Sequence, residues 1–255
     1  PIQQDIPEYM ELCRTGRYTE ALTLITEKNP LPFTTGTICA HRCQTKCTRN
    51  YYDESVHIRE TKLVAAENGY DALMRSLKKP APVTDGRKAA IIGGGPTGIA
   101  AAYFLGRAGI PVTVFEKSSR LGGVPMQVIP GFRISEAAIE KDIALMQFYG
   151  AEIRLNTPAP SVAELNVAGY THIFFAVGAG KAGRLNIPGN VVPVIQWLRD
   201  LKAGKKVSLG HVAVIGGGNT AMDAARAAIR SGAASATLVY RRTKRYMPAD
   251  AEELE

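Results

Sequence analysis

Two glycine-rich turns are the segments of this chain best suited to bind a cofactor. The first turn is Gly93-Gly94-Gly95-Pro96-Thr97-Gly98, and the second is Gly216-Gly217-Gly218-Asn219-Thr220-Ala221. In such a turn the first glycine permits a tight bend, the second lets the backbone approach a pyrophosphate, and the third small residue lets a helix pack on a strand. The N-terminus of that helix then faces the negative charge of the ligand. The two turns therefore predict two dinucleotide-binding sites.

The strand that follows each turn ends in a different kind of charge. After the first turn, the next strand runs into Glu116, with Lys117 behind it. A carboxylate at this place accepts hydrogen bonds from ribose hydroxyls and repels a 2′-phosphate, which favours FAD or NAD. After the second turn, the next strand runs into Arg241 and Arg242, whose planar guanidinium groups suit the 2′-phosphate of NADP. The alternative interpretation is that these charges are ordinary solvated strand ends.

Three cysteines form a second candidate site. Cys39, Cys43 and Cys47 recur every four residues and have Lys and Arg among their neighbours. In a reducing cytosol such a cluster favours zinc or an iron–sulfur cluster over disulfides. Alternatively, residues four apart share one helix face and serve as small core side chains. Cys13 lies in the expected helix 7–14 and is interpreted as a core residue.

The elements that must position these residues change in type near Lys88. Helical signals alone precede it, and strand–helix alternation follows, which predicts an α/β fold with parallel βαβ units. The expected strands are 88–92, 111–115, 151–155, 172–177, 212–215 and 236–240, and an amphipathic helix is expected over 135–149. We expect the strand 172–177 to be buried and to bring Gly178 close to a ligand.

Composition narrows the possible partners. The 255 residues carry a net charge of +8, but outside Arg241–Arg245 the basic residues are interleaved with acidic ones, and they show no alternation with aromatic residues. Dinucleotide phosphates and an acidic protein partner therefore explain the charge better than a nucleic acid. With no long apolar run and no signal-like N-terminus, we expect a cytoplasmic protein without a membrane span. The chain begins at Pro1 and stops at Glu255 within an apparent helix, so we expect a piece of a longer polypeptide.

Together these residues resemble the glutamate synthase small-subunit family of NADPH-dependent iron–sulfur flavoproteins. That family also includes the N-terminal half of dihydropyrimidine dehydrogenase, and the nearest member is expected to be an enterobacterial selenate reductase iron–sulfur subunit. Further segments that carry the resemblance are Arg17–Leu22, Asn29–Pro32, Gly122–Gly123, Ile129–Ile134, Gly216–Asp223, Tyr240–Arg242 and Met247–Pro248.

The resemblance implies three domains and an electron-transfer function. A helical iron–sulfur-type domain would cover 1–86, a Rossmann-like FAD-binding domain 87–190, and a partial, inserted NADPH-binding domain 191–255. NADPH would reduce FAD, and electrons would pass singly through [4Fe-4S] clusters to an electron-accepting subunit or domain. Because hydride transfer needs no side-chain acid or base, no catalytic residue is expected.

By the same resemblance each candidate residue receives a role. Gly93, Gly95 and Gly98 would contact the FAD pyrophosphate, Glu116 the adenosine ribose, and Gly122, Gly123 and Arg133 would lie on the flavin side. Pro96, Thr97, Lys117 and Gly178 are further candidates for cofactor binding. The NADPH contacts would be Gly216, Gly218, Asn219 and Thr220, with Arg241 and Arg242 at the 2′-phosphate. The cluster ligands would be Cys39, Cys43 and Cys47.

The chain also departs from this family. The family's first cysteine group would precede Pro1, and three cysteines cannot supply the ligands of two four-iron clusters. Lys62 stands where some members place a Gln or Glu ligand, and the strand that closes the FAD site is expected beyond Glu255. We therefore expect clusters to be absent or incomplete here. Two other functions stay open: a non-catalytic, redox-sensing dinucleotide-binding module, and a zinc-bearing nucleic-acid-binding domain.

Overall fold

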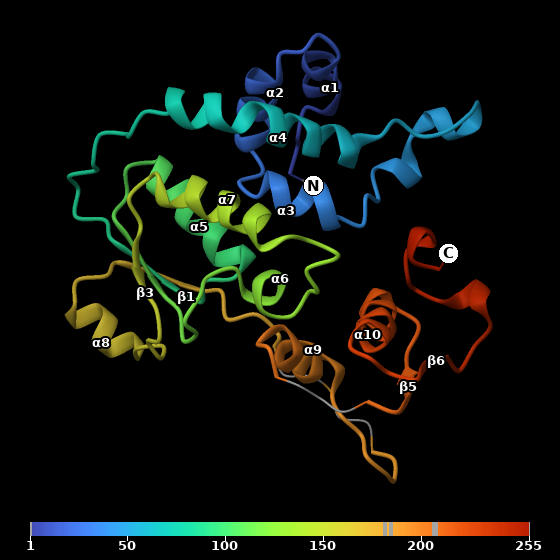
Figure 1. Ribbon diagram of the computed structural model, residues 1–255. Coiled ribbons are helices and arrows are strands. Elements are labelled where there is room, and N and C mark those ends of the chain that lie inside the picture. Colours follow the sequence, from blue (N-terminus) through green and yellow to red (C-terminus); the bar gives the residue numbers. More distant parts are fainter. Residues whose placement is uncertain (1, 181–182, 184–185, 206–208, 255) are drawn as a thin grey trace. The chain divides into compact units, whose positions relative to one another are not determined.

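Two compact units make up the chain in the computed structural model (Figure 1). The first comprises Pro1–Met126 and Arg133–Gly178, and the second comprises Gln127–Phe132 and Ala179–Glu255. The structure describes residues 2–180, 183, 186–205 and 209–254. Within these ranges, no helix combines the length and the apolar character that crossing a lipid bilayer requires.

The N-terminal part of the first unit is helical. Its elements are α1 (Ile6–Arg14), α2 (Tyr18–Thr26), α3 (Pro32–Ile38) and α4 (Ile58–Ser76), with short 3-10 helices at Gln44–Lys46 and Thr48–Tyr51. Asp5 begins α1 because its carboxylate accepts a hydrogen bond of 3.1 Å from the amide of Glu8. Pro32 is the first residue of α3. A backbone amide at this position has no acceptor within the helix, so the amide proton that proline lacks costs no hydrogen bond.

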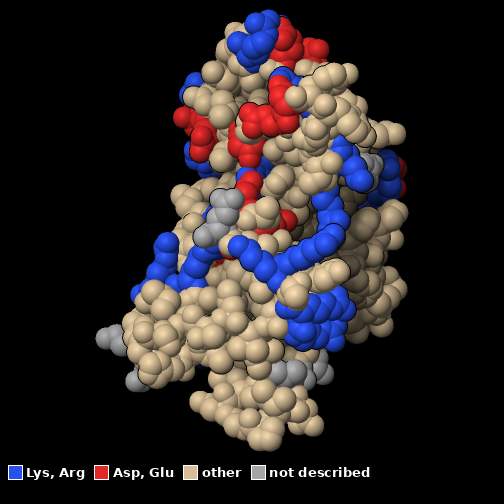
Figure 2. Space-filling view, turned by 90° about the vertical axis from the view of Figure 1, so that its right-hand side faces the viewer, with Lys and Arg blue, Asp and Glu red and all other residues tan. Residues whose placement is uncertain are grey.

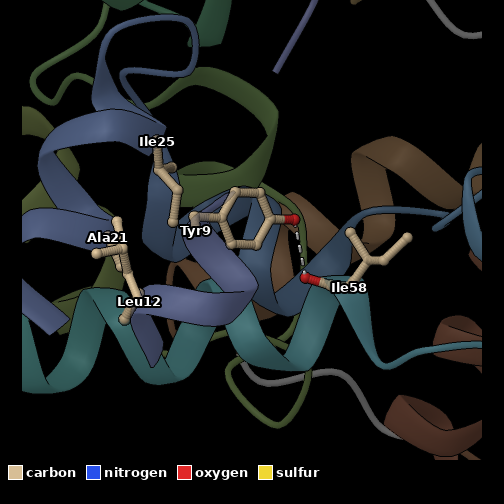
Figure 3. Close-up of a cluster of buried hydrophobic side chains, with 6 residues drawn as sticks. Tyr9, Leu12, Ala21, Ile25 and Ile58 are labelled. Carbon is tan, nitrogen blue, oxygen red and sulfur yellow. Dashed lines mark hydrogen bonds between the residues drawn. The ribbon is translucent and has the colours of Figure 1, made fainter. Parts of the chain in front are cut away.

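One apolar core holds α1, α2 and α4 together (Figure 3). Tyr9 and Ile25 are fully buried there, and the hydroxyl of Tyr9 donates a hydrogen bond of 3.4 Å to the carbonyl oxygen of Ile58. The backbones of α2 and α4 also approach closely, since a Cβ at Gly69 would lie 2.5 Å from the carbonyl oxygen of Tyr18. Helix α4 also contacts the cysteine segment, because the amide of Arg59 donates a hydrogen bond of 3.2 Å to the side-chain oxygen of Gln44.

The described sheet of the first unit contains four parallel strands. They are β1 (Ala89–Ile92), β2 (Val112–Phe115), β3 (Glu152–Arg154) and β4 (His172–Phe175), in the spatial order β3-β2-β1-β4. The helices between them are α5 (Pro96–Arg107), α6 (Gly123–Gln127), α7 (Glu136–Gln147) and α8 (Val162–Val167). The chain continues to one side of β1 through β2 and β3 and then crosses to the other side through β4. The carboxyl end of β1 is therefore the switch point at which ligands bind in open parallel sheets.

Helices cover both faces of this sheet. Successive side chains of β1 point to opposite faces. Ile91 faces α5, because the Cγ2 atom of Ile91 would lie 3.2 Å from a Cβ at Gly98 on that helix. Ala90 and Ile92 pack on the opposite side with Leu165 of α8.

The strand expected over 172–177 forms as β4, but the expectation that it is buried is wrong. Phe174 is 40% exposed, Phe175 64% and Val177 66%. A continuous apolar run is typical of a strand with neighbours on both sides and helices on both faces. In the described sheet β4 lies at the edge, and Ile173 is its residue that packs against the apolar cluster of Ala90 and Leu165.

The second unit contains a shorter βαβ arrangement. Its elements are α9 (Val194–Lys202), β5 (His211–Ile215), α10 (Asn219–Arg230) and β6 (Ser235–Val239), with 3-10 helices at Lys244–Tyr246 and Ala251–Glu253. Strands β5 and β6 are parallel, and α10 connects them. Val214 of β5 packs against Ala221 and Ala224 of α10. The expected fold class, a helical region followed by α/β units, is confirmed.

A short segment from the middle of the chain, set apart in sequence from the rest of the second unit, belongs to that unit. Residues 127–132 pack on α9 and α10 through Val128 and Phe132. The ammonium group of Lys202 donates a hydrogen bond of 2.7 Å to the carbonyl oxygen of Ile129. The guanidinium of Arg230 lies 4.2 Å from the ring centre of Phe132.

Candidate functional site

The first glycine turn leaves no room for side chains at its first and last positions. Gly93 follows β1 with φ of +109°, and a Cβ there would lie 2.4 Å from the carbonyl oxygen of Ala176 beyond β4. A Cβ at Gly98 would lie 1.9 Å from the carbonyl oxygen of Gly93. Helix α5 therefore packs directly against the turn, as the glycine pattern predicts.

The middle of the first turn has one closed and one open position. A Cβ at Gly94 would lie 2.3 Å from the Cδ2 atom of Leu121, so this position faces the protein. A Cβ at Gly95 would meet nothing closer than the Cα of Gly123, at 3.8 Å. Gly95 is the N-cap of α5, Pro96 opens that helix, and Thr97 behind it is exposed. Backbone is thus accessible where the helix N-terminus could face a phosphate.

The carboxylate of Glu116 holds this turn in place through hydrogen bonds. It accepts hydrogen bonds of 2.7 Å from the amide of Gly94 and of 2.8 Å from the amide of Ser118, and the Ser118 hydroxyl also donates to it. Burial would raise the pKa of Glu116, but the hydrogen bonds from Ser118 and Gly94 outweigh it and hold the pKa below the ordinary value. Glu116 is therefore an ionised residue that orders the turn, while the adjacent Lys117 is exposed.

A second glycine loop lies against the first turn. The amide of Gly122 donates a hydrogen bond of 2.8 Å to the carbonyl oxygen of Gly94. A Cβ at Gly123 would lie 2.8 Å from the Cα of Gly95, so only glycine allows this approach. The structure therefore brings Gly122 and Gly123 to the first turn. Arg133 is half-buried in the same unit, and Gly178 is exposed with φ of +68°.

The second glycine turn repeats the same arrangement with different neighbours. A Cβ at Gly217 would lie 2.7 Å from the ring of Tyr240, so this position is closed. A Cβ at Gly218 would meet only the Cγ of Pro248, at 3.8 Å, so the N-cap of α10 is open like the N-cap of α5. An open cavity of about 710 Å³ runs along β5, and its lining includes Gly216, Gly218 and Thr220. This volume lies within the usual range for a ligand-binding cavity.

A segment that follows β6 braces the second turn. The side chain of Asn219 donates a hydrogen bond of 2.7 Å to the carboxylate of Asp250 and accepts one of 2.9 Å from the amide of Asp250. The amide of Ala249 donates to the carbonyl oxygen of Gly217 at 3.0 Å. Asn219 is thus an internal partner of Asp250 in this structure. Sequence reasoning did not assign a role to Asp250, although Met247 and Pro248 before it contribute to the resemblance.

The basic residues expected at the 2′-phosphate follow β6 directly. Arg241 and Arg242 are exposed, as are Lys244 and Arg245 further on. Lys and Arg side chains gather in groups on the face drawn in Figure 2. The structure thus has a negative charge, Glu116, directly after β2 and two positive charges, Arg241 and Arg242, directly after β6. The nucleotide assignment depends on this difference in charge.

The three clustered cysteines do not lie on one helix. Helix α3 ends at Ile38, and Cys39 is its C-cap; Cys43 precedes the first 3-10 helix, and Cys47 separates the two 3-10 helices. The alternative of a shared helix face is therefore wrong. Cys39 and Cys47 are half-buried, Cys43 is exposed, and all three are free thiols. In the part of the chain that the structure describes, His, Cys, Asp and Glu side chains form no group of three or more placed to hold a metal ion.

Two buried residues with polar groups, Lys62 and Tyr9, interact electrostatically with the thiols. Lys62 on α4 is 7% exposed; burial lowers the pKa of its ammonium group, while the thiols of Cys39 and Cys43 act in the opposite direction. Burial raises the pKa of Tyr9, and Cys43, Cys13 and Cys39 add to this effect. Cys13 packs at the edge of the core of α1, α2 and α4, as its interpretation as a core residue predicts.

Two protein-family models match the chain. Residues 87–255 match the family described as pyridine nucleotide-disulphide oxidoreductase. Residues 1–72 match the family described as dihydropyrimidine dehydrogenase domain II, 4Fe-4S cluster. The helical part and the α/β part of the chain thus correspond to different family models.

Curated relatives match the whole chain but are longer than it. The chain is 44% identical to the oxidoreductase YgfK of Escherichia coli K12 and covers 25% of that protein. It is 34% identical to the NADP(+)-dependent formate dehydrogenase subunit beta of Moorella thermoacetica, covering 40%, and 30% identical to the NADPH glutamate synthase small chain of Escherichia coli K12, covering 58%. These matches confirm the resemblance to the glutamate synthase small-subunit family.

Solved structures share the fold. FprA of Mycobacterium tuberculosis in complex with NADPH superposes with a TM-score of 0.58 at 22% identity, over 66% of this chain and 46% of FprA. Thioredoxin reductase of Lactococcus lactis gives a TM-score of 0.50 at 21% identity, over 66% of this chain and 60% of the reductase. At these identities the likeness concerns the fold alone.

Proposed function

Because the chain belongs to the pyridine nucleotide-disulphide oxidoreductase family, we propose that it is the FAD- and NADPH-binding part of an electron-transfer flavoprotein. FAD binds at the turn Gly93–Gly98 and NADPH at the turn Gly216–Ala221. The observation that carries this assignment is the pair of equally open glycine turns followed by opposite charges, Glu116 after one and Arg241 with Arg242 after the other.

The first turn fits the pyrophosphate and adenosine of FAD. The open backbone at Gly95 and the N-terminus of α5 suit the two phosphates. Glu116 keeps the turn in shape through the amide of Gly94, and its negative charge disfavours a 2′-phosphate at the adenosine ribose. Gly122 and Gly123 carry the chain past the turn without side chains in the way.

The second turn fits NADPH. Gly218 and the N-terminus of α10 suit the pyrophosphate, and Asp250 holds Asn219 at the edge of the site. Arg241 and Arg242 bind the 2′-phosphate through charge-assisted hydrogen bonds. Bound flavin supplies hydride acceptance, and the protein supplies binding, orientation and exclusion of water.

In this proposal, electrons leave the flavin toward the cysteine segment. Cys39, Cys43 and Cys47 would supply thiolates for an iron–sulfur cluster, and a bound cluster would carry single electrons. Since no described group of three or more ligands converges on one point, the described residues alone do not complete such a site. The electron acceptor is a further domain or subunit, and free thiols such as these suit a cytoplasmic location.

Rapid kinetics of flavin reduction test the proposal. The FAD-loaded protein is mixed anaerobically with NADPH or NADH, and loss of flavin absorbance is followed. NADPH is expected to react faster at equal concentration, and the double substitution Arg241→Ala with Arg242→Ala should abolish that preference by removing a bidentate phosphate partner.

A matched control separates specific binding from general charge. The pair Lys244→Ala with Arg245→Ala removes the same charge from residues further along the same segment and should leave the preference in place. Equal rates with both nucleotides in the parent protein would contradict the NADPH assignment. Flavin binding without reduction by either nucleotide would favour the redox-sensing module instead.

A further inference from the structure

A buried carboxylate links the α/β part of the first unit to the helical part. Asp142 lies on α7, and its exposed fraction is 0%. Its carboxylate oxygens accept hydrogen bonds of 3.0 Å from the amide of Phe33 and of 2.7 Å from the amide of Thr34. These partners are more than a hundred residues away in the sequence.

The two amides belong to the first turn of α3. Amides at this place in a helix have no acceptor within the helix itself, so they depend on a cap or on water. The residue before the helix, Leu31, offers no side-chain cap. Asp142 therefore provides, from a distant part of the same unit, the acceptor that a local Ser or Asp usually provides at a helix N-terminus.

Neighbouring contacts close the interface around this carboxylate. The hydroxyl of Tyr70 on α4 donates a hydrogen bond of 3.1 Å to the carbonyl oxygen of Lys141. The ammonium of Lys141 lies 4.9 Å from the ring centre of Phe33 and 5.2 Å from that of Tyr70. In Figure 1, α3 lies beside α7 within the first unit.

Helix α3 connects this contact to the cysteine segment. Its far end is Cys39, five residues beyond Thr34, or roughly 7.5 Å at the usual rise of an α-helix. Helix α3 also fits tightly on α4, since a Cβ at Gly36 would lie 3.0 Å from the Cα of Leu63. A short rigid helix thus joins the carboxylate to the first of the three clustered thiols.

We propose that Asp142 is a positioning residue for the cysteine segment, holding the first turn of α3 and thereby fixing where Cys39 leaves that helix. Its function in electron transfer rests on the function proposed above, because only then must the thiols keep a fixed position relative to the flavin domain. The contact itself is independent of that function.

Hydrogen–deuterium exchange and thiol labelling of the FAD-loaded full-length protein test this inference. Asp142→Asn keeps one acceptor oxygen but turns an amino group toward the other amide, so one hydrogen bond is lost. The amides of Phe33 and Thr34 should exchange at least about tenfold faster than in the parent. Cys39 should be alkylated several-fold faster, while Cys13 on α1 keeps its rate.

Glu140→Gln is the matched control. It removes the same charge from the same helix, but Glu140 is exposed and pairs with Arg120. Exchange near α3 should stay within about twofold of the parent. Flavin reduction by NADPH should be unchanged in both variants, which distinguishes a local change at α3 from general misfolding.

A measurement on the unsubstituted protein tests the inference even if the Asp142→Asn variant does not fold. First-turn helix amides exposed to water exchange quickly, as is expected for Thr220 of α10. Phe33 and Thr34 should be protected about a hundredfold more than Thr220. Comparable rates there, or an unchanged exchange pattern in Asp142→Asn, would overturn the inference. If NADPH fails to reduce the parent's flavin, the proposed function falls while these exchange data still decide the role of Asp142.

Discussion

The burial of Asp142 makes the stability of the first unit depend on pH. Burial raises the pKa of this carboxyl from 3.8 to about 7, although the hydrogen bonds from Thr34 and Phe33 oppose the shift. The folded state therefore binds the proton more tightly than the unfolded state does. Stability from this group is fully present below about pH 4 and is lost as the pH rises to about 7.

The size of this effect follows from the two pKa values. A difference of about 3 pKa units corresponds to about 4 kcal/mol, of which about 3 kcal/mol falls between about pH 5 and about pH 8. Glu116 acts in the opposite direction, because its pKa is lowered, but its effect lies below its ordinary value of 4.5. Asp142 thus dominates the comparison between mildly acidic and mildly basic conditions.

Urea unfolding of the parent and of Asp142→Asn across this pH range measures the effect. Tyrosine circular dichroism reports mainly the first unit, because only Tyr240 and Tyr246 of the ten tyrosines lie in the second. The fluorescence of Trp197, the single tryptophan, reports α9 in the second unit. The free-energy difference between parent and variant should change by about 3 kcal/mol between about pH 5 and about pH 8, in favour of the parent at the acidic end. A difference that stays constant within about 0.5 kcal/mol would refute the reasoning. The transition reported by Trp197 should not respond to the substitution.

Three further substitutions test the glycine turns. Glu116→Ala leaves the buried amide of Gly94 without its acceptor and should weaken FAD binding by about 1–3 kcal/mol, measured by flavin titration; unchanged affinity would contradict the bracing role. Gly98→Ala should destabilise the first unit by about 2 kcal/mol or more in thermal unfolding, because the added Cβ meets a backbone oxygen at 1.9 Å; equal melting temperatures would be inconsistent with the packing of α5. Asp250→Ala removes the acceptor for Asn219 and should weaken NADPH binding about tenfold in calorimetry with FAD affinity unchanged, and a parallel loss of both affinities would point to unfolding instead.

The local features of the fold could be predicted from the sequence because they depend on neighbours in the chain. A strand, a glycine turn and a helix follow each other within about twenty residues, so the geometry of Gly93 and Gly98 is encoded locally. The charged strand ends are equally local, and Glu116 lies after β2 as expected. Its contact with the amide of Gly94 adds a structural function to the one that the resemblance implies.

What could not be predicted depends on partners distant in the sequence. Asp142 lies in an amphipathic helix where a charged residue normally faces water, and nothing near it indicates that Phe33 and Thr34 supply its hydrogen bonds. Asp250 reaches Asn219 across 31 residues. The exposure of Phe175 has the same origin, because an apolar strand does not reveal whether a further strand lies beside it.

The visible spectrum of the purified protein under anaerobic conditions, before and after NADPH, tests the central claim most directly. The proposed function predicts flavin absorption bands with close to one FAD per chain and their loss when NADPH is added. A protein that purifies without flavin and takes up none, or one whose flavin stays oxidised in excess NADPH, would contradict it.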